Sequence, residues 1–256
     1  EGYPMSVIDV SDLEIKEEEK NTTNALIRGV AAKFIQMGCE VKGFDAYVTS
    51  TVLPGSGLSS SAAYETLIGT IINHLYYGAK ATAVEVAQIG QWAENVYFGK
   101  KCGLLDQSVC AYGGLVCIDF CDQNEPRVEK LDFDFEKYGY TIFLTDTKSS
   151  HENLTDDYVA IREEMGGVAK YFGCDVLSEV DEGEFYSKLP ALRNVCSDRA
   201  ILRAMHFFGE TKRAYDEAEA LKNGNIDLFL KLVNESGISS GNLLQNLYSN
   251  GAPTEQ

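Results

Sequence analysis

Apolar residues recur at three- and four-residue spacing in several stretches of the chain, a period that is typical of amphipathic α-helices. In the clearest stretch, Ile68, Ile72 and Leu75 fall on one face. Glycine follows several of these stretches, as it often does where a helix ends. The pattern predicts six helices, at residues 24–37, 60–77, 83–98, 156–172, 198–221 and 225–236.

Three shorter stretches have the pattern of β-strands. Residues 44–52 ("FDAYVTSTV") alternate aromatic or β-branched residues with polar ones, as a half-buried strand does. Residues 113–120 ("GGLVCIDF") and 139–147 ("GYTIFLTDT") are typical of short buried strands. The acidic interval between these two, residues 122–139, is a candidate domain boundary.

The composition is that of a globular protein. The chain has 256 residues, of which 45% are hydrophobic, so it can bury a sizeable core and is long enough for two domains. Its net charge of −17 would repel nucleic acid phosphates and anionic lipid, and no apolar run approaches the length of a membrane span. We therefore expect neither nucleic acid nor membrane partners.

The cysteines indicate a reduced protein. They are odd in number, widely scattered and never spaced as C-x-x-C, which argues against a structural zinc site. We expect small, buried, reduced side chains in a cytoplasmic protein. The seven are Cys39, Cys102, Cys110, Cys117, Cys121, Cys174 and Cys196.

The loop "PGSGLSSSAA", residues 54–63, lies between a predicted strand and a predicted helix. Gly55 and Gly57 allow the backbone to approach a ligand closely, and the serines fall at the helix N-terminus, where unpaired N–H groups attract anions. The alternative is that Ser59 only caps the helix. The loop is not a Walker loop, because no Gly-Lys-Ser/Thr occurs, and it lacks the third glycine of a dinucleotide loop.

The motif G-x-G-L-S-S-S-A-A resembles the ATP-binding signature of the GHMP small-molecule kinases in its galactokinase form. The segment "AENVYFGKKCGLLDQSVCAYGG" is similar to that family's Glu, Gly and C-G-I/L-M/L-D-Q in the same order and spacing. In "LTDTKSSHENLTDDYVAIREE", His151 precedes Tyr158 by seven residues, as a His precedes a sugar-contacting Tyr in the family. A fourth segment, "AMHFFGETKRAYDEAEALKNGNIDLFLKLVNES", is similar to the family's R-H-x-x-x-E helix, with Met205 in place of the Arg.

The resemblance implies a set of site residues. Asp106 corresponds to the catalytic aspartate that orients or accepts the proton of the sugar's anomeric hydroxyl, and Gly103, Asp106 and Tyr158 would contact the sugar. Ser61 and Glu94 would bind Mg²⁺, for which hard oxygen ligands are suited. The ATP phosphates would lie on Pro54, Gly55, Ser56, Gly57, Leu58, Ser59, Ser60 and Ser61.

Each of these residues also has a purely structural interpretation from its local sequence. Asp106 could be the N-cap of a short helix, Glu94 an exposed helix carboxylate, and Tyr158 a partly buried aromatic residue. A Ser/His/Asp hydrolase built from Ser60, His151 and Asp106 is disfavoured, because the G-x-S-x-G motif is missing.

The fold that the resemblance implies is α+β, with the two domains of a GHMP kinase. Residues 1–137 would form the N-terminal mixed-sheet domain with the phosphate loop, and residues 138–256 the C-terminal α+β domain. Two other family motifs, an N-terminal sugar signature and a C-terminal glycine-rich motif, do not occur in the sequence. We therefore expect the chain to correspond to the central part of such a kinase.

The activity implied is ATP-dependent phosphorylation of the anomeric (C1) hydroxyl of galactose or a related sugar, giving sugar 1-phosphate and ADP. The cofactors would be ATP and Mg²⁺, and the partners small molecules. Two alternatives remain at this point: a catalytically silent sugar- and ATP-binding sensor, and another GHMP kinase acting on mevalonate or homoserine.

Overall fold

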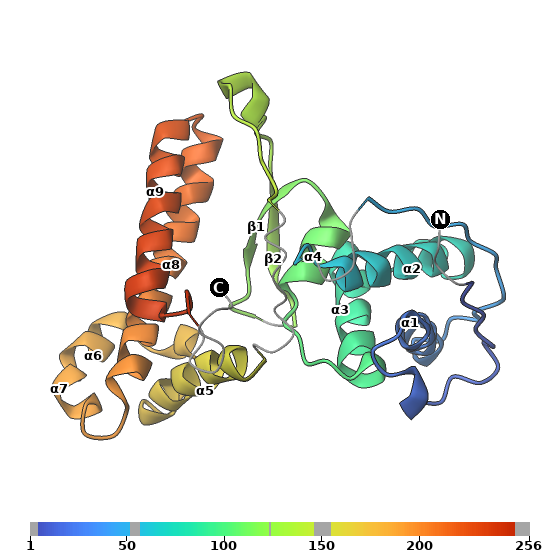
Figure 1. Ribbon diagram of the computed structural model, residues 1–256, viewed down its shortest axis with the longest axis horizontal. Helices are drawn as coiled ribbons and strands as arrows, with labels where there is room; N and C mark the ends of the chain where they lie inside the picture. The colour runs from blue at the N-terminus through green and yellow to red at the C-terminus, as the bar shows by residue number, and fades with distance from the viewer. Residues whose placement is uncertain (1–4, 52–56, 123, 146–154, 249–256) are drawn as a thin grey trace. The chain divides into compact units, whose positions relative to one another are not determined.

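The computed structural model of the chain describes residues 5–51, 57–122, 124–145 and 155–248. The chain divides into two compact units, Glu1–Glu129 and Lys130–Gln256. Each unit has an apolar core of its own. The helices and strands that form the units are labelled in Figure 1.

The first unit is largely helical. Its helices are α1 (Thr23–Gln36), α2 (Ser60–Tyr76), α3 (Ala83–Ala93) and α4 (Leu105–Tyr112), preceded by a 3-10 turn, η1 (Glu17–Glu19). Helix α3 continues into a π-helical segment, η2 (Glu94–Phe98). Strand β1 (Leu115–Asp119) follows α4 and pairs with β2 (Arg127–Leu131), within which the division between the units falls.

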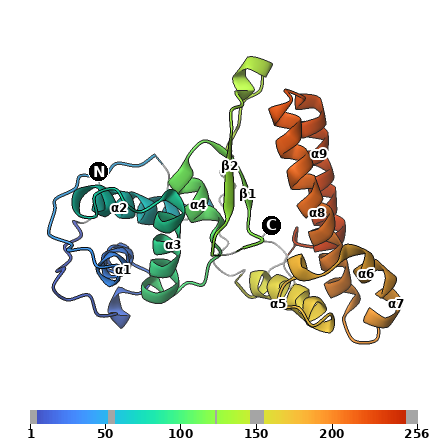
Figure 2. The same cartoon turned by 180° about the vertical axis from the view of Figure 1, so that it is seen from behind.

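The core of the first unit lies between the apolar faces of α1, α2 and α3, which Figures 1 and 2 show packed together. Phe34 and Val30 of α1 meet Ile72 of α2 and Ile89 of α3, and all four are at most 2% exposed. Burying a side chain of this size contributes about 1.5–3 kcal/mol. The three-helix core therefore fixes the helix ends from which the candidate site is built.

The second unit is helical in its described part. Helices α8 and α9 lie side by side in both views (Figures 1 and 2), and a core around Phe185, Leu192 and Phe208 joins α8 to α5, α6 and α7. The elements are η3 (Phe135–Tyr138), α5 (Thr155–Tyr171), η5 (Leu177–Glu179), α6 (Glu182–Ser187), α7 (Leu189–Leu192), α8 (Asp198–Lys222), α9 (Ile226–Ser239) and the π-helical η6 (Ser240–Leu244).

All six predicted helices are confirmed, as α1, α2, α3 with η2, α5, α8 and α9. The predicted break between the last two is a turn in which Gly224 has φ +67°, a conformation that glycine adopts without strain. Helices α6 and α7 were not predicted, because four to six residues are too few to show a helical period.

One of the three predicted strands is confirmed, as β1. The predictions for residues 44–52 and 139–147 are wrong wherever the structure describes them, since residues 44–51 and 139–145 form no strand. Tyr47 is 94% exposed and Phe143 is 85% exposed. A strand needs a neighbour to pair its backbone N–H and C=O groups, and the sheet in the described part of the chain contains β1 and β2 alone.

The helices and small sheet agree with the predicted α+β class. The division after Glu129 falls inside the acidic interval 122–139, while the boundary between residues 137 and 138 remains a prediction from family resemblance. None of the seven cysteines forms a disulfide. Within the described ranges, no helix combines the length and apolar character needed to cross a bilayer.

Candidate active site

The described part of the predicted phosphate loop leads directly into α2. Pro54, Gly55 and Ser56 lie outside the described residues. Gly57 has φ +73°, and Ser59 adopts the left-handed conformation with φ +55°, which costs a residue other than glycine about 1–2 kcal/mol. The chain therefore enters this helix through a strained turn.

Ser59 occupies the N-cap position of α2, but its side chain makes no capping hydrogen bond. The alternative in which its hydroxyl caps the helix is therefore wrong. The first N–H groups of a helix have no partner within the helix, and here the Ser59 side chain does not supply one. This end of α2 has the chemistry to receive an anion.

Ser61, in the first turn of α2, contacts Glu94 at the start of the π-helical segment. The Ser61 hydroxyl donates a hydrogen bond of 3.0 Å to Glu94 Oε1. Lys100 Nζ lies 3.8 Å from the same oxygen. Glu94 is only 2% exposed, so its interpretation as an exposed helix carboxylate is wrong. The structure brings together the two residues that the family resemblance assigns to Mg²⁺.

Sequence reasoning missed two residues beside Glu94. The Gln107 amide donates one hydrogen bond of 2.8 Å to Glu94 Oε2 and another of 3.1 Å to Glu65 Oε2. Glu65 and Gln107 are both fully buried. We refer to Glu65, Glu94 and Gln107 as the carboxylate cluster. Gln107 could have been found from its place directly after Asp106 in the motif C-G-L-L-D-Q. Glu65 belongs to no such motif and lies among the apolar positions of α2, so the sequence did not indicate it.

The cluster changes the acidity of Glu65 and of the neighbouring Cys102. Burial, with the nearby negative charge of Glu94, raises the pKa of Glu65 to about 8, against smaller opposing effects of the Gln107 amide and Lys100. Burial and the adjacent Glu94 carboxylate raise the pKa of Cys102 to about 12. At neutral pH Glu65 is therefore mostly protonated, and the thiol of Cys102 is not an ionised nucleophile.

Asp106 and Gly103 lie outside this buried cluster. Helix α4 begins at Leu105 with Leu104 as N-cap, so Asp106 is the second residue of the helix and the interpretation as its N-cap is wrong. The Asp106 side chain is exposed, whereas its neighbour Gln107 points into the cluster, because successive residues of a helix point about 100° apart. A Cβ on Gly103 would meet no atom within 4 Å, so space is open there.

Tyr158 belongs to the second unit, on α5, and is 60% exposed, so its interpretation as a partly buried aromatic residue is wrong. His151 lies outside the described residues. The residues that the structure shows in direct contact are thus Ser61 and Glu94, and the parts played by all the predicted site residues remain predictions.

The residues present fit a hard divalent cation. No group of three His, Cys, Asp or Glu side chains in the described ranges is arranged to hold a metal ion. The Ser61 hydroxyl and the Glu94 carboxylate are, however, the oxygen ligands that Mg²⁺ accepts when water and phosphate supply the rest. Their direct contact therefore suits a cation that arrives with a nucleotide.

The segment that resembles the R-H-x-x-x-E helix has a structural role. His206 on α8 is 8% exposed, and its Nδ1 lies 2.8 Å from Ser239 Oγ on α9. Glu210 accepts hydrogen bonds from Arg213 and from Ser236 on α9. These contacts hold α8 against α9.

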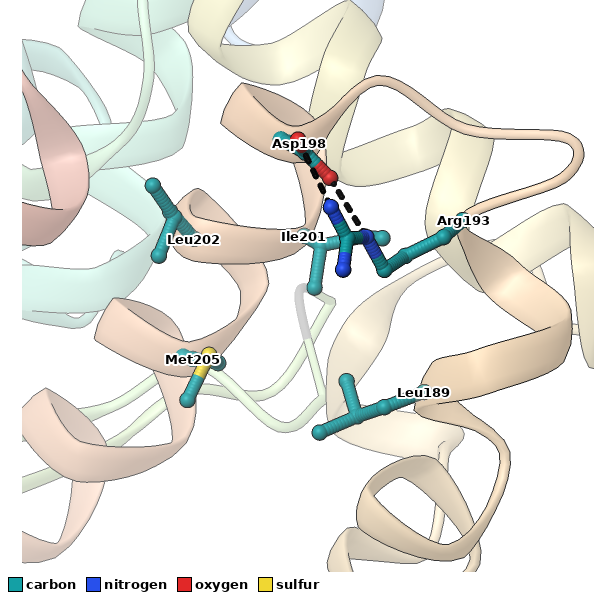
Figure 3. A pocket seen from close by; sticks show the side chains of 6 residues that line it. All are labelled: Leu189, Arg193, Asp198, Ile201, Leu202 and Met205. Carbon is teal, nitrogen blue, oxygen red and sulfur yellow. Dashed lines mark hydrogen bonds and ion pairs between the residues drawn. The ribbon is translucent and has the colours of Figure 1, made fainter.

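Met205 faces a different part of the second unit. It lines an open hollow of about 350 Å³. Figure 3 shows the Arg193 guanidinium paired to the Asp198 carboxylate beside the apolar side chains of this hollow. Predicted site residues are absent from its lining, which comprises Leu189, Arg193, Asp198, Ile201, Leu202 and Met205.

Comparison with known proteins gives this geometry a family context. Residues 25–114 match the family described as GHMP kinases N terminal domain. A galactokinase from Glaesserella parasuis serovar 5 (strain SH0165) is 32% identical over 91% of this chain and 61% of its own length. A galactokinase from Clostridium acetobutylicum is 30% identical over 92% of this chain and 60% of its own length.

A solved structure is also similar. The crystal structure of Lactococcus lactis galactokinase complexed with galactose matches 92% of this chain and 60% of that chain, with a TM-score of 0.69 and 23% sequence identity. This likeness confirms the predicted fold. The chain spans about three fifths of the length of these relatives.

Proposed function

We propose that the chain belongs to the galactokinases within the GHMP kinases, and that the whole protein transfers the γ-phosphoryl group of ATP to the anomeric hydroxyl of galactose or a closely related sugar. The products are sugar 1-phosphate and ADP. Galactose is the first sugar to test, because the similar Lactococcus lactis enzyme was solved in complex with it. The absence of disulfides supports action in the reducing cytoplasm.

One observation carries the proposal: Ser61, in the first turn of the helix that follows the phosphate loop, donates a hydrogen bond to the buried Glu94. Phosphoryl transfer needs positioning and charge neutralisation more than covalent chemistry. A helix N-terminus beside a hydroxyl and a carboxylate supplies a phosphate site and two cation ligands in one place.

Each predicted residue then has a role. Residues 54–61 bind the ATP phosphates, and Ser61 and Glu94 hold Mg²⁺, which when bound neutralises charge on the phosphate oxygens. Asp106 orients the anomeric hydroxyl and accepts its proton as the sugar oxygen bonds to the γ-phosphorus and the bond to ADP breaks. Gly103 leaves room for the sugar, and Tyr158 donates a hydrogen bond to it.

The test uses the whole protein with ATP, Mg²⁺ and a panel of galactose, N-acetylgalactosamine, glucose, mevalonate and homoserine, with ADP release as the measurement. We expect turnover with galactose or N-acetylgalactosamine. Asp106→Asn keeps the shape of the side chain and removes the proton acceptor, so kcat should fall by about 10²–10⁴-fold while the Kd for ATP changes less than threefold. Asp132→Asn, at another exposed aspartate, is the matched control and should retain full activity.

Two results would reject the proposal. Sugar and ATP binding without turnover above the Asp106→Asn background would instead support a sensor. Turnover with mevalonate or homoserine but with no sugar would support a different GHMP kinase.

A further inference from the structure

The carboxylate cluster joins three elements that the proposed function uses. Glu65 comes from α2, Glu94 from the start of the π-helical segment and Gln107 from α4, and the three are 0%, 2% and 0% exposed. The single amide nitrogen of Gln107 bonds to both carboxyl groups, at 2.8 and 3.1 Å. An amide nitrogen carries two hydrogens, enough for one to each carboxyl group, and the Cys102 sulfur lies 3.6 Å from the same nitrogen.

This cluster is not an efficient way to stabilise a core. Glu65 Oε1, Gln107 Oε1 and Ser108 Oγ are buried and have no hydrogen-bond partner among the described residues. Each buried polar atom left without a partner costs about 1–3 kcal/mol. Apolar side chains of similar volume would pack there at lower cost, which points to a role other than stability.

The bonding pattern fixes the direction of the Glu94 carboxylate. Its Oε2 accepts from Gln107, so its Oε1 is the oxygen that faces the Ser61 hydroxyl and Lys100. Rotation of this carboxylate would break the bond to Gln107 or the bond to Ser61.

Close packing holds the amide in place. A Cβ on Gly90 of α3 would lie 3.1 Å from Glu65 Cβ and 3.3 Å from Gln107 Cγ, so only glycine leaves these side chains undisturbed. Helix α4 carries both Gln107 and the exposed Asp106. One rigid element therefore positions the predicted catalytic group directly and the Glu94 carboxylate through its hydrogen bond from Gln107.

The geometry points to Gln107 and Glu65 as positioning residues: the Gln107 amide, held on its other side by Glu65, keeps Glu94 directed at Ser61 so that a divalent cation bound to ATP meets a preset pair of ligands. This inference rests on the proposed function and names two further residues for it. Outer-shell partners of this kind change cation affinity by about 10–100-fold when removed.

The experiment measures Mn²⁺ binding in the presence of ATP by electron paramagnetic resonance, and the Mg²⁺ dependence of turnover, in the whole protein. Gln107→Met removes both donors and should weaken Mn²⁺ binding by about 10–100-fold while KM for the sugar changes less than twofold. Glu65→Met removes one acceptor and should weaken Mn²⁺ binding by a smaller factor. Glu65→Gln keeps a carbonyl acceptor and should restore binding to within threefold of wild type.

Gln88→Met on α3 is the matched control, because Gln88 donates to the backbone oxygen of Asn124, away from the cluster, and it should leave cation dependence unchanged. If Gln107→Met lowers Tm yet keeps wild-type Mn²⁺ binding, the positioning role is rejected. Should Gln107→Met fail to fold, the comparison of Glu65→Met with Glu65→Gln replaces it. Equal Mn²⁺ binding by these two variants would also reject the positioning role.

The failure of this inference can be told apart from the failure of the proposed function. Sugar turnover with unchanged cation dependence in the variants would reject the positioning role and keep the kinase. Weakened Mn²⁺ binding in a protein that phosphorylates no sugar would reject the kinase and keep the positioning role. Absence of Mn²⁺ binding with ATP in the wild type would overturn both.

Discussion

The two units bury polar side chains in different ways. In the second unit, Glu164 accepts hydrogen bonds from Arg199 and Arg203, and Arg203 also donates to the backbone oxygen of Leu244. In the first unit, the carboxylate cluster places two acids around one amide. Among the described residues, the buried side-chain atoms without a partner belong to the first unit, in or beside this cluster.

The difference separates a structural network from a candidate site. Paired charges in the second unit hold α5, α8 and the end of η6 together, and they leave little for a ligand to satisfy. Buried polar atoms without a partner need an explanation, and in the first unit they lie in or beside the cluster that holds the Glu94 carboxylate against Ser61. Variants of the Glu164 ion pairs and of the carboxylate cluster therefore test whether the first network serves stability and the second serves a site.

The largest effect is expected from Arg203→Met. Arg203 is 4% exposed, and its loss leaves Glu164 with one partner and the Leu244 oxygen with none, so the free energy of unfolding should fall by about 3–5 kcal/mol. Urea unfolding followed by far-UV circular dichroism measures the loss. The fluorescence of Trp92, the one tryptophan of the sequence, reports on the first unit and should keep its midpoint.

Arg193→Met is the matched control. Its guanidinium pairs with Asp198, but both side chains are about two-thirds exposed, so the change should cost less than about 1 kcal/mol. Equal losses in the two arginine variants would show that the hydrogen bonds of the buried Arg203 stabilise the second unit no more than an exposed ion pair does.

A smaller effect is expected in the first unit, where the raised pKa of Glu65 makes the free energy of unfolding depend on pH. The pKa is about 8 in the folded protein and near 4.5 when unfolded, so between these values the folded state holds a proton that the unfolded state releases. Stability from this group is complete below the unfolded pKa and is lost as the pH rises toward 8, by up to about 1.4 kcal/mol per pH unit. Glu94 and Asp106 strengthen this shift and Lys100 weakens it.

Urea unfolding followed by Trp92 fluorescence between pH 6.5 and 8 measures this slope, and Glu65→Gln should flatten it. Burial lowers the pKa of His206 in the second unit, so that histidine costs stability as the pH falls below about 6.5 and is silent in this window. An unchanged slope in Glu65→Gln would mean that Glu65 is ionised in the folded protein.

The sequence predicts helices better than strands, for a physical reason visible in two segments. A helix such as α2 pairs its own backbone groups, so the spacing of Ile68 and Ile72 is enough to place it. Residues 44–51 have the alternation of a strand, but a strand forms only beside a partner that the described part of the chain does not provide. The alternation of polar and apolar residues is a property of the segment itself and does not show whether a second strand lies beside it.

The residues of the candidate site likewise include some that the sequence could identify and some that it could not. Ser61, Glu94 and Asp106 could be named in advance because the sequence resembles the galactokinase motifs at these positions, and the structure places the first two in contact. Glu65 could not, because a single acid within an apolar helical period gives no sign that it faces another acid 29 positions later. Contacts between distant segments depend on packing, which periodicity does not specify.

The smallest expected effect compares two helical glycines. Gly90→Ala would place a Cβ 3.1 Å from Glu65 Cβ and 3.2 Å from Glu65 Oε2, so the cluster must move by a few tenths of an ångström, and we expect a loss of about 1 kcal/mol despite alanine's better helix propensity. Gly167→Ala on α5 meets no atom within 4 Å and should gain about 0.5–1 kcal/mol from that propensity. Urea unfolding measures both, by Trp92 fluorescence for Gly90→Ala and by circular dichroism for Gly167→Ala. If Gly90→Ala were as stabilising as Gly167→Ala, Glu65 and Gln107 would have room to shift, and the tight packing that holds the Gln107 amide against Glu94 would be disproved.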